Sequence, residues 1–124
     1  TVNYKGKEPD SEGRYSVITD YSPDILGSIE SQDISGYNTF LISWCDIKGG
    51  ASTSVLRRMK RGDILIIKGE SQGGCTDSNR FFDILHAMEK KKKIISLKEV
   101  ADQLNGNSCR FYGLHDYFSV YKRK

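Results

Sequence analysis

The chain has few cysteines and no long apolar run, and both features narrow its class. Its three cysteines, Cys45, Cys75 and Cys109, are widely spaced among 124 residues, and no CxxC pair occurs. We therefore expect no disulfide framework, and reduced thiols in an intracellular protein are the better interpretation. No apolar stretch approaches the roughly 20 residues of a membrane-spanning helix. The opening TVNYKGKEPD lacks the apolar core of a secretory leader and an initiator methionine, so we expect an excised domain or a processed chain.

Motifs of catalysis and metal binding are also missing from the sequence. The chain contains no GxSxG, HExxH or P-loop pattern. Its two histidines, His86 and His115, combine with the cysteines in no common zinc spacing. His115-Asp116 is an isolated dipeptide, which is weak evidence for a catalytic pair. We therefore expect a protein that is not an enzyme and uses no cofactor or metal.

Positive charge is present but clustered. The chain is one domain in length and can bury a real core without disulfides or metals. Its net charge is +3 and its pI is near 8.7, which is only mildly basic. The clusters are Lys5, Lys7 and Arg14, then Arg57, Arg58, Lys60 and Arg61, then residues 90–93, and finally residues 122–124. Each can be a solvated surface or linker, or a set of phosphate contacts, and residues 90–93 also fit a nuclear-import signal.

Short segments rich in β-branched and aromatic residues, separated by turn residues, predict strands through the first three quarters of the chain. The predicted strands are YSVITDY (residues 15–21), YNTFLISW (37–44), DILIIKG (63–69) and RFFDILHAM (80–88). A Gly- and Ser-rich loop, residues 70–79, precedes the last of these. The first residues, TVNYKGK, fit the end of a preceding strand.

Two helices are predicted among these strands. The first covers residues 52–60, with Val55, Leu56 and Met59 on one side. The second covers residues 96–106, where Ser96 and Glu99 are spaced as in a capping box. The aromatic and basic tail that follows, residues 109–124, has no clear assignment.

This order of elements is the layout of a five-stranded OB-fold barrel, an all-β fold with a short helix between strands 3 and 4. Small β-sandwiches and other small barrels remain alternatives. We predict that residues 1–95 form the barrel. Residues 96–124 then form a C-terminal helix with an aromatic and basic extension, which packs on the barrel or trails from it.

Three short pieces, VITDYS, FLISWCD and MKRGDILIIKG, add a resemblance to a known family. Their order and spacing resemble the single-stranded-DNA-binding OB folds of the protection-of-telomeres proteins and the related ciliate telomere end-binding proteins. The resemblance covers residues 4–88. It rests on a Thr-Asp-Tyr strand ending, an aromatic residue near the end of the third strand and a Gly-Asp before the fourth, which here are Thr19-Asp20-Tyr21, Trp44 and Gly62-Asp63.

The resemblance implies a nuclear, non-enzymatic domain in the telomeric region of the chromosome. Such a domain binds the G-rich single-stranded overhang sequence-selectively, protects the chromosome end and helps to regulate telomere length. It implies single-stranded telomeric DNA and other telomere-complex proteins as partners, with no membrane and no small-molecule substrate.

Candidate DNA-binding residues follow from the way OB folds hold single strands, with aromatic platforms for bases and a positive groove for the backbone. Trp44 and Tyr21 are the expected platforms, and Asp20 is expected to accept hydrogen bonds from base donors. The other candidates are Tyr4, Lys5, Thr19, Lys48, Arg57, Lys68, Ser71, Gln72, Arg80 and Phe81. Structural roles compete at each position: a core tryptophan, a tyrosine at the barrel rim, a turn aspartate, a solvated hairpin loop.

Two other functions remain open on the same fold. An OB domain can instead serve as a protein-interaction module of a telomere or replication complex, in which case it binds no DNA. It can also be a general binder of single-stranded DNA or RNA, with little preference for G-rich repeats.

Overall fold

The structure is a computed structural model that describes residues 4–5, 18–19, 33–48, 50–109 and 113–124. The chain divides into two compact units, Thr1–Gln32 and Asp33–Lys124. In the first unit, β1 (Tyr4–Lys5) pairs antiparallel with β2 (Ile18–Thr19), which lies within the strand predicted over residues 15–21. Among the described residues, no helix has the length and apolar character to cross a membrane.

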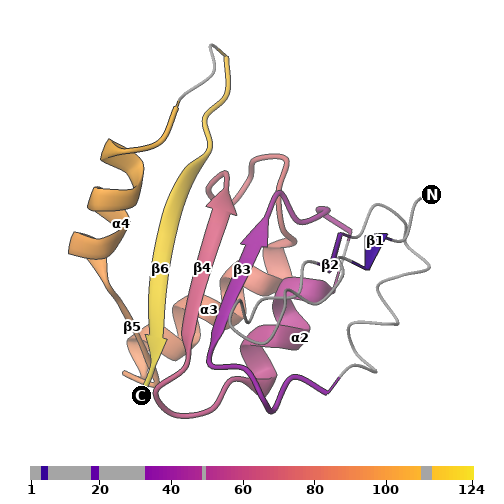
Figure 1. The fold of residues 1–124 in the computed structure, drawn as a ribbon, viewed down its shortest axis with the longest axis vertical. Helices are drawn as coiled ribbons and strands as arrows, with labels where there is room; N and C mark the ends of the chain where they lie inside the picture. The colour runs from indigo at the N-terminus through magenta and orange to yellow at the C-terminus, as the bar shows by residue number, and fades with distance from the viewer. Residues whose placement is uncertain (1–3, 6–17, 20–32, 49, 110–112) are drawn as a thin grey trace. The chain divides into compact units, whose positions relative to one another are not determined.

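The second unit is built on an open mixed sheet (Figure 1). Its strands are β3 (Thr39–Ser43), β4 (Ile64–Gly69), β5 (Ile94–Ser96) and β6 (Tyr117–Arg123), in the spatial order β3-β4-β6-β5. β3 and β4 run parallel, while β6 is antiparallel to both of its neighbours. The prediction of an all-β, five-stranded OB-fold barrel is therefore wrong, because helices pack on an open sheet here.

The helix α2 (Ala51–Arg58) explains why the sheet is mixed. It confirms the helix predicted over residues 52–60, and it buries Val55 and Leu56. α2 joins the ends of two parallel strands, and a parallel pair requires such a crossover connection. The sequence pattern located β3, α2 and β4 correctly, but periodicity does not specify which strands pair or in which direction.

The strand predicted over residues 80–88 is instead the middle of helix α3 (Asn79–Lys90). The Ser78 hydroxyl caps this helix by accepting a hydrogen bond from the Phe81 backbone N–H at 3.2 Å. Phe81, Phe82 and Leu85 are all buried, and their spacing places them on one helical face. The two phenylalanine rings pack edge to face, with centroids 5.3 Å apart. Adjacent aromatic residues favour a strand by propensity, but burial of a whole helical face decides the outcome here.

The C-terminal third belongs to the same sheet. The helix predicted over residues 96–106 is confirmed as α4 (Lys98–Gly106), although Ser96 ends β5 and no side chain caps α4. The tail that had no assignment contains β6, which lies between β4 and β5. Residues 96–124 are therefore part of the unit that includes residues 33–95, because one of its internal strands comes from the tail.

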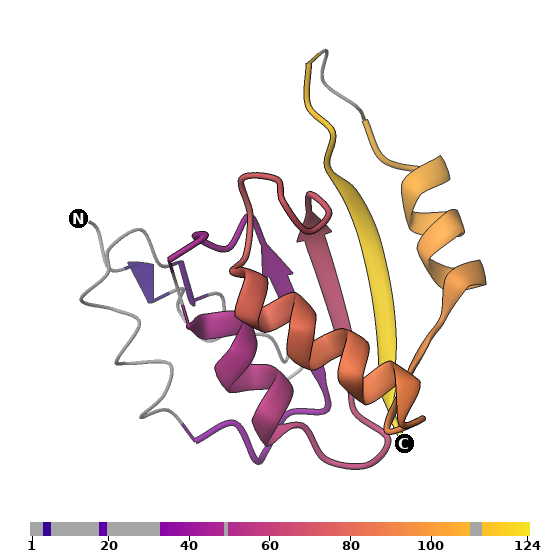
Figure 2. The ribbon, with the colours of Figure 1, turned by 180° about the vertical axis from the view of Figure 1, so that it is seen from behind.

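The core lies between one face of the sheet and the helices α2 and α3, which cover that face (Figures 1 and 2). Its most deeply buried apolar side chains are Leu56, Leu65, Phe81, Leu85 and Ile94. On the opposite face, Val120 is buried, but Leu41 of the edge strand β3 is 66% exposed.

Candidate nucleic-acid interface

Three basic segments that are far apart in the sequence meet at one end of the sheet. They are residues 57–61 at the end of α2, residues 90–93 at the end of α3 and residues 122–124 at the end of β6; we call them together the basic end. Backbone hydrogen bonds hold them together. The Lys124 N–H donates to the Lys93 carbonyl at 2.9 Å, and the Gly62 N–H donates to the Arg123 carbonyl at 2.8 Å. In Figure 1, the end of α3, the connection from α2 to β4 and the end of β6 lie together near the C-terminus.

Most cations of the basic end face solvent. Arg57, Lys60, Arg61, Lys122, Lys124 and the four lysines 90–93 are exposed, whereas Arg58 and Arg123 are half-buried. The ion pairs Lys68–Asp116 and Lys98–Asp102 lie away from the basic end. Within the basic end, the Lys60 ammonium donates a hydrogen bond to the Ser35 carbonyl at 3.1 Å. The exposed side chains of Lys122, Lys124 and residues 90–93 can contact an anionic partner.

The modest net charge of the chain hides a large asymmetry. Residues 57–63, 89–93 and 122–124 contain eleven Lys and Arg but only two acids, Asp63 and Glu89, which gives them a formal charge of +9. The rest of the chain contains 8 Lys and Arg and 14 Asp and Glu, a formal charge of −6, and one of these acids, Asp33, lies near Lys60 and Arg58. The excess of positive charge within the basic end produces a local potential that attracts anions.

Two aspartates near the basic end are occupied by local hydrogen bonds. Asp63 is 7% exposed, and its Oδ2 accepts a hydrogen bond from the Lys60 N–H at 2.7 Å. Asp33 accepts one from the Ser35 N–H at 2.9 Å. Hydrogen bonds from Ser35 lower the pKa of Asp33, and the positive charges of Lys60 and Arg58 lower it further. These two carboxylates neutralise only a small part of the positive charge of the basic end.

Trp44 and Lys68, two residues predicted to bind DNA, lie at the other end of the sheet. Thr39 pairs with Ile64 and Ser43 pairs with Lys68, so β3 and β4 both end there. The Trp44 Nε1–H donates to Asp116 Oδ2 at 2.9 Å, and the Lys68 ammonium lies 3.7 Å from the same oxygen. Lys68 also lies 4.5 Å from the centroid of the Phe118 ring. The structure thus joins these two residues in one cluster, centred on Asp116.

The backbone of Trp44 is unusual. Its φ is +51°, in the left-handed region that bulky residues seldom adopt, and its side chain is 41% exposed. The hydrogen bond from its indole to Asp116 and the bond from its backbone N–H to the Lys68 carbonyl at 2.8 Å hold it in place. This arrangement leaves one part of an otherwise fixed indole open to solvent.

The other predicted residues of the second unit are scattered. Ser71 and Gln72 are exposed in the loop after β4, and Gln72 Nε2 donates to Asp83 Oδ1 at 3.2 Å. Phe81 is 1% exposed in the core, so its ring is not accessible as a platform. The remaining three candidates are exposed cations: Lys48 in a turn, Arg57 at the basic end and Arg80 at the start of α3.

The candidates in the first unit have only a backbone description. Tyr4 pairs with Thr19, and Lys5 pairs with Ile18. Asp20 and Tyr21 lie outside the described residues. The structure therefore brings together Trp44 and Lys68 in one cluster and Ser71 and Gln72 in one loop.

A buried polar cluster near the start of α2 was not foreseen. Asp77 is 4% exposed and Ser52 is 1% exposed, yet Asp77 Oδ1 and Ser52 Oγ have no hydrogen-bond partner. Burial raises the pKa of Asp77, and the neighbouring Ser52 and Cys45 oppose that shift. Burial also raises the pKa of the Cys45 thiol, so the reactive thiolate is disfavoured. Within the described part of the chain, no group of three or more His, Cys, Asp or Glu side chains is arranged to hold a metal ion.

The sequence predicted the basic end only in part. It shows the three basic clusters as separate segments, but nothing in the sequence indicates that they lie close together in the fold. Comparison with known proteins adds no further guide, because no protein-family model, curated protein or solved structure matches this chain.

Proposed function

We propose that this chain binds nucleic acid through phosphate contacts at the basic end. The observation that carries the proposal is the convergence of residues 57–61, 90–93 and 122–124, held by backbone hydrogen bonds from Lys124 to Lys93 and from Gly62 to Arg123. A row of phosphates is the partner that matches many exposed ammonium and guanidinium groups of one sign. Lys and Arg contacts to phosphates supply most of the affinity in sequence-independent binding.

A purely structural role accounts for only part of this charge. Cations in the last turn of a helix interact favourably with the helix dipole, which explains Arg57, Arg58 and Lys90. The dipole effect falls off within that turn, so it does not explain residues 122–124, which end a strand. Like charges held close together also repel one another, and a bound polyanion relieves that repulsion.

Recognition of a G-rich telomeric single strand stays a prediction from the resemblance. The described strands 39–43, 64–69, 94–96 and 117–123 form an open sheet and not the barrel that would supply its groove, and Trp44 lies at the opposite end of the strands from the basic end. The proposal therefore concerns the phosphate backbone, and selectivity for sequence or strandedness becomes something that the experiment measures.

The test is fluorescence anisotropy of the full chain with labelled oligonucleotides of roughly 20 nucleotides, a length that offers many more phosphates than the expected contacts. The oligonucleotides are a G-rich telomeric strand, its complement, their duplex and the RNA version. We expect binding that weakens steeply with salt. Four phosphate contacts on a duplex predict a loss of roughly 150-fold between about 50 and 200 mM salt.

Two triple variants with equal charge loss locate the site. Lys91→Gln, Lys122→Gln and Lys124→Gln remove three exposed cations from the basic end. Lys48→Gln, Arg80→Gln and Lys98→Gln remove three exposed cations elsewhere, including two of the candidates from the resemblance. We expect the first triple to lose at least about tenfold in affinity and to reduce the salt slope by about 2, while the second stays within about threefold.

The alternatives give distinct results. Equal losses in both triples would mean that only net charge matters, and the basic end would not be the site. A larger loss in the second triple, together with a sharp loss on Trp44→Ala, would place the binding site near Trp44 and away from the basic end. No binding to any oligonucleotide at low salt would overturn nucleic-acid binding and favour the protein-interaction alternative.

A further inference from the structure

The edge strand β3 bonds to the sheet through every second residue. Among the described strands, β4 is its one neighbour. At the start of β3, the Ile64 N–H donates to the Asn38 carbonyl at 2.8 Å, and just past its end the Trp44 N–H donates to the Lys68 carbonyl at 2.8 Å. Successive residues of a strand direct their N–H and C=O groups to opposite edges, so the even-numbered residues of β3 face β4. The backbone groups of its odd-numbered residues are therefore directed away from the sheet.

The residues whose backbone groups point away are Thr39, Leu41 and Ser43. Within the part of the chain that the structure describes, these N–H and C=O groups have no hydrogen-bond partner. The three side chains are exposed as well, and Leu41 is 66% exposed. A row of unpaired backbone groups beside exposed side chains is a template for pairing with another strand.

β3 lacks the sequence features that protect an edge strand from such pairing. Its sequence, TFLIS, contains no charged residue and no proline. The opposite edge of the sheet differs, because β5 has only three residues and follows the lysine run 90–93. Short length and nearby lysines are common protections of an edge strand. The sheet is therefore expected to extend at β3 and not at β5, which favours a closed pair of copies over an open-ended assembly.

The sequence of β3 is complementary to itself when two copies pair antiparallel about a two-fold axis at Leu41. On the face of the sheet opposite α2 and α3, Leu41 then lies against Leu41 of the second copy, and Thr39 lies against Ser43. On the helix-covered face, Phe40 lies against Ile42, an aromatic and β-branched pair of the kind that stabilises antiparallel sheets. In this register the outward N–H and C=O groups of the two strands lie opposite one another, as hydrogen-bonded pairs require.

The distribution of charge favours the same antiparallel arrangement. The basic end lies at the start of β3 and β4, because Ile64, the first residue of β4, pairs with both Thr39 and Lys122. Antiparallel pairing turns the second copy end for end, so the two basic ends lie at opposite ends of the joined sheet. Parallel pairing would place both at the same end, where their like charges repel each other.

We propose that this chain forms a homodimer by antiparallel pairing of β3 with β3 of a second copy. The two four-stranded sheets join into one continuous sheet, and the interface is isologous, since each copy presents the same residues to the other. Five residues from each copy make a smaller contact than a standard interface. We therefore expect a weak dimer, with a dissociation constant of roughly 10–100 µM.

The test is sedimentation velocity of the full chain without nucleic acid, from about 5 to 500 µM, a range that spans the expected dissociation constant. The average mass should rise from the 14.0 kDa of one chain toward twice that value. Leu41→Lys places like charges opposite each other at the two-fold axis, so it should weaken the dimer at least about tenfold. Val100→Lys makes a similar change at a 42% exposed position of α4 and should dimerise like the parent. Matching far-ultraviolet circular dichroism of the two variants shows that both remain folded.

Hydrogen exchange followed by NMR tests which backbone groups pair. The N–H groups of Phe40 and Ile42 face β4 and should exchange slowly at every concentration. Those of Thr39, Leu41 and Ser43 should exchange rapidly in the monomer and more slowly as the dimer forms. In a mixture of labelled and unlabelled chains, a nuclear Overhauser effect between the α-protons of Phe40 in one copy and Ile42 in the other fixes the register. Pairs without mutual hydrogen bonds bring their Cα atoms to about 4.5 Å, close enough for this signal.

Several results would overturn the proposal. One is a monomer over the whole concentration range. Another is a dimer that Leu41→Lys leaves intact, or that Val100→Lys weakens equally, because the association would then use another surface. A dimer without the signal between Phe40 and Ile42 would contradict the pairing of the two β3 strands. All of these measurements are made without nucleic acid, so they do not depend on whether the basic end binds it.

Discussion

The side chain of Asn105 in α4 substitutes for a neighbouring strand at Phe118 of β6. Its Oδ1 accepts a hydrogen bond from the Phe118 N–H at 2.7 Å, and its Nδ2 donates to the Phe118 carbonyl at 3.0 Å. β5 pairs with β6 only from Ser96↔Tyr121 to Ile94↔Arg123, and the Leu97 N–H adds one bond to the Val120 carbonyl at 2.8 Å. The edge of β6 at Phe118 lies beyond both and relies on Asn105. One carboxamide thus satisfies a backbone donor and acceptor that β5 is too short to reach.

Replacement of Asn105 should destabilise the fold. Asn105→Ala leaves the Phe118 N–H and carbonyl without partners at a part-buried position, which should lower the free energy of unfolding by about 1–3 kcal/mol. Urea denaturation followed by far-ultraviolet circular dichroism measures this. Gln103→Ala, an exposed position on the same helix, should change the stability by less than about 0.5 kcal/mol. Equal stability of the two variants would contradict the role of Asn105.

Gly69 should resist substitution because of its neighbour Thr76. A Cβ added at Gly69 would lie 2.6 Å from Thr76 Oγ1, and Thr76 is buried and bonded to the Glu70 N–H. Gly69→Ala should therefore lower the free energy of unfolding by about 1–3 kcal/mol, as overpacking does. Gly106→Ala meets nothing within 4 Å at the end of α4, so it should be neutral or stabilising by up to about 1 kcal/mol. Thermal unfolding of both variants compares them directly, and an unaffected Gly69→Ala would mean that Thr76 moves freely.

Asp77 should make stability depend on pH in a defined direction. Burial raises its pKa above the ordinary 3.8, so the folded protein holds this proton more tightly than the unfolded chain does. The stability that protonated Asp77 contributes is complete below pH 3.8 and is lost as pH rises through the raised pKa. Asp77→Asn does not titrate, and asparagine tolerates the backbone φ of +58° at this position.

The measurement is the difference in free energy of unfolding between Asp77→Asn and the parent chain, across a pH series from acid to neutral. Contributions from all other titrating groups cancel in this difference. We expect the difference to move in favour of the variant as pH rises. A difference that is constant with pH would show that Asp77 ionises with the same pKa in the folded and unfolded chains.

The three cysteines should react with alkylating agents at different rates. Cys75 and Cys109 are exposed, whereas Cys45 is half-buried and its pKa is raised by burial. We expect Cys45 to be modified at least roughly tenfold more slowly, because both access and thiolate content are reduced there. Mass spectrometry of timed iodoacetamide reactions resolves the three sites, and the urea-unfolded chain provides the control with similar rates. Cys45 reacting as fast as Cys75 would contradict its placement.

Much of the local structure followed from the sequence. The apolar run of β4, the helix α2 with Val55 and Leu56 on one face, and α4 after the lysine run were all predictable from periodicity. The segment around Phe81 and Phe82 was not, since its residues favour strands by propensity but bury a helical face in this fold. The resemblance to telomeric OB folds depended on short motifs, and those motifs did not specify how the strands are arranged.

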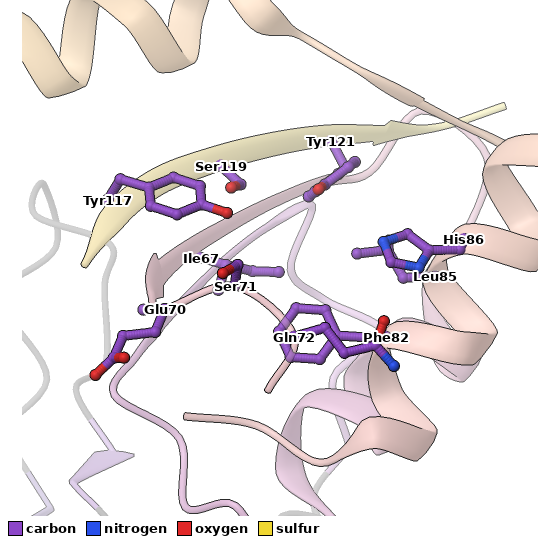
Figure 3. A pocket seen from close by; sticks show the side chains of 11 residues that line it. Ile67, Glu70, Ser71, Gln72, Phe82, Leu85, His86, Tyr117, Ser119 and Tyr121 are labelled. Atoms are coloured by element: carbon purple, nitrogen blue, oxygen red, sulfur yellow. The ribbon is translucent and has the colours of Figure 1, made fainter. Parts of the chain in front are cut away.

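The sequence by itself determined where charge and apolar residues occur along the chain, since helical and strand periodicities are local properties. Only the tertiary structure decided that the tail supplies β6 between β4 and β5, and that residues 57–61, 90–93 and 122–124 therefore share one end. The same pairing placed Tyr117 and Tyr121 of β6 opposite Phe82 of α3 across a cavity (Figure 3). Strand order depends on contacts between residues far apart in sequence, and those contacts leave no periodic pattern in the chain.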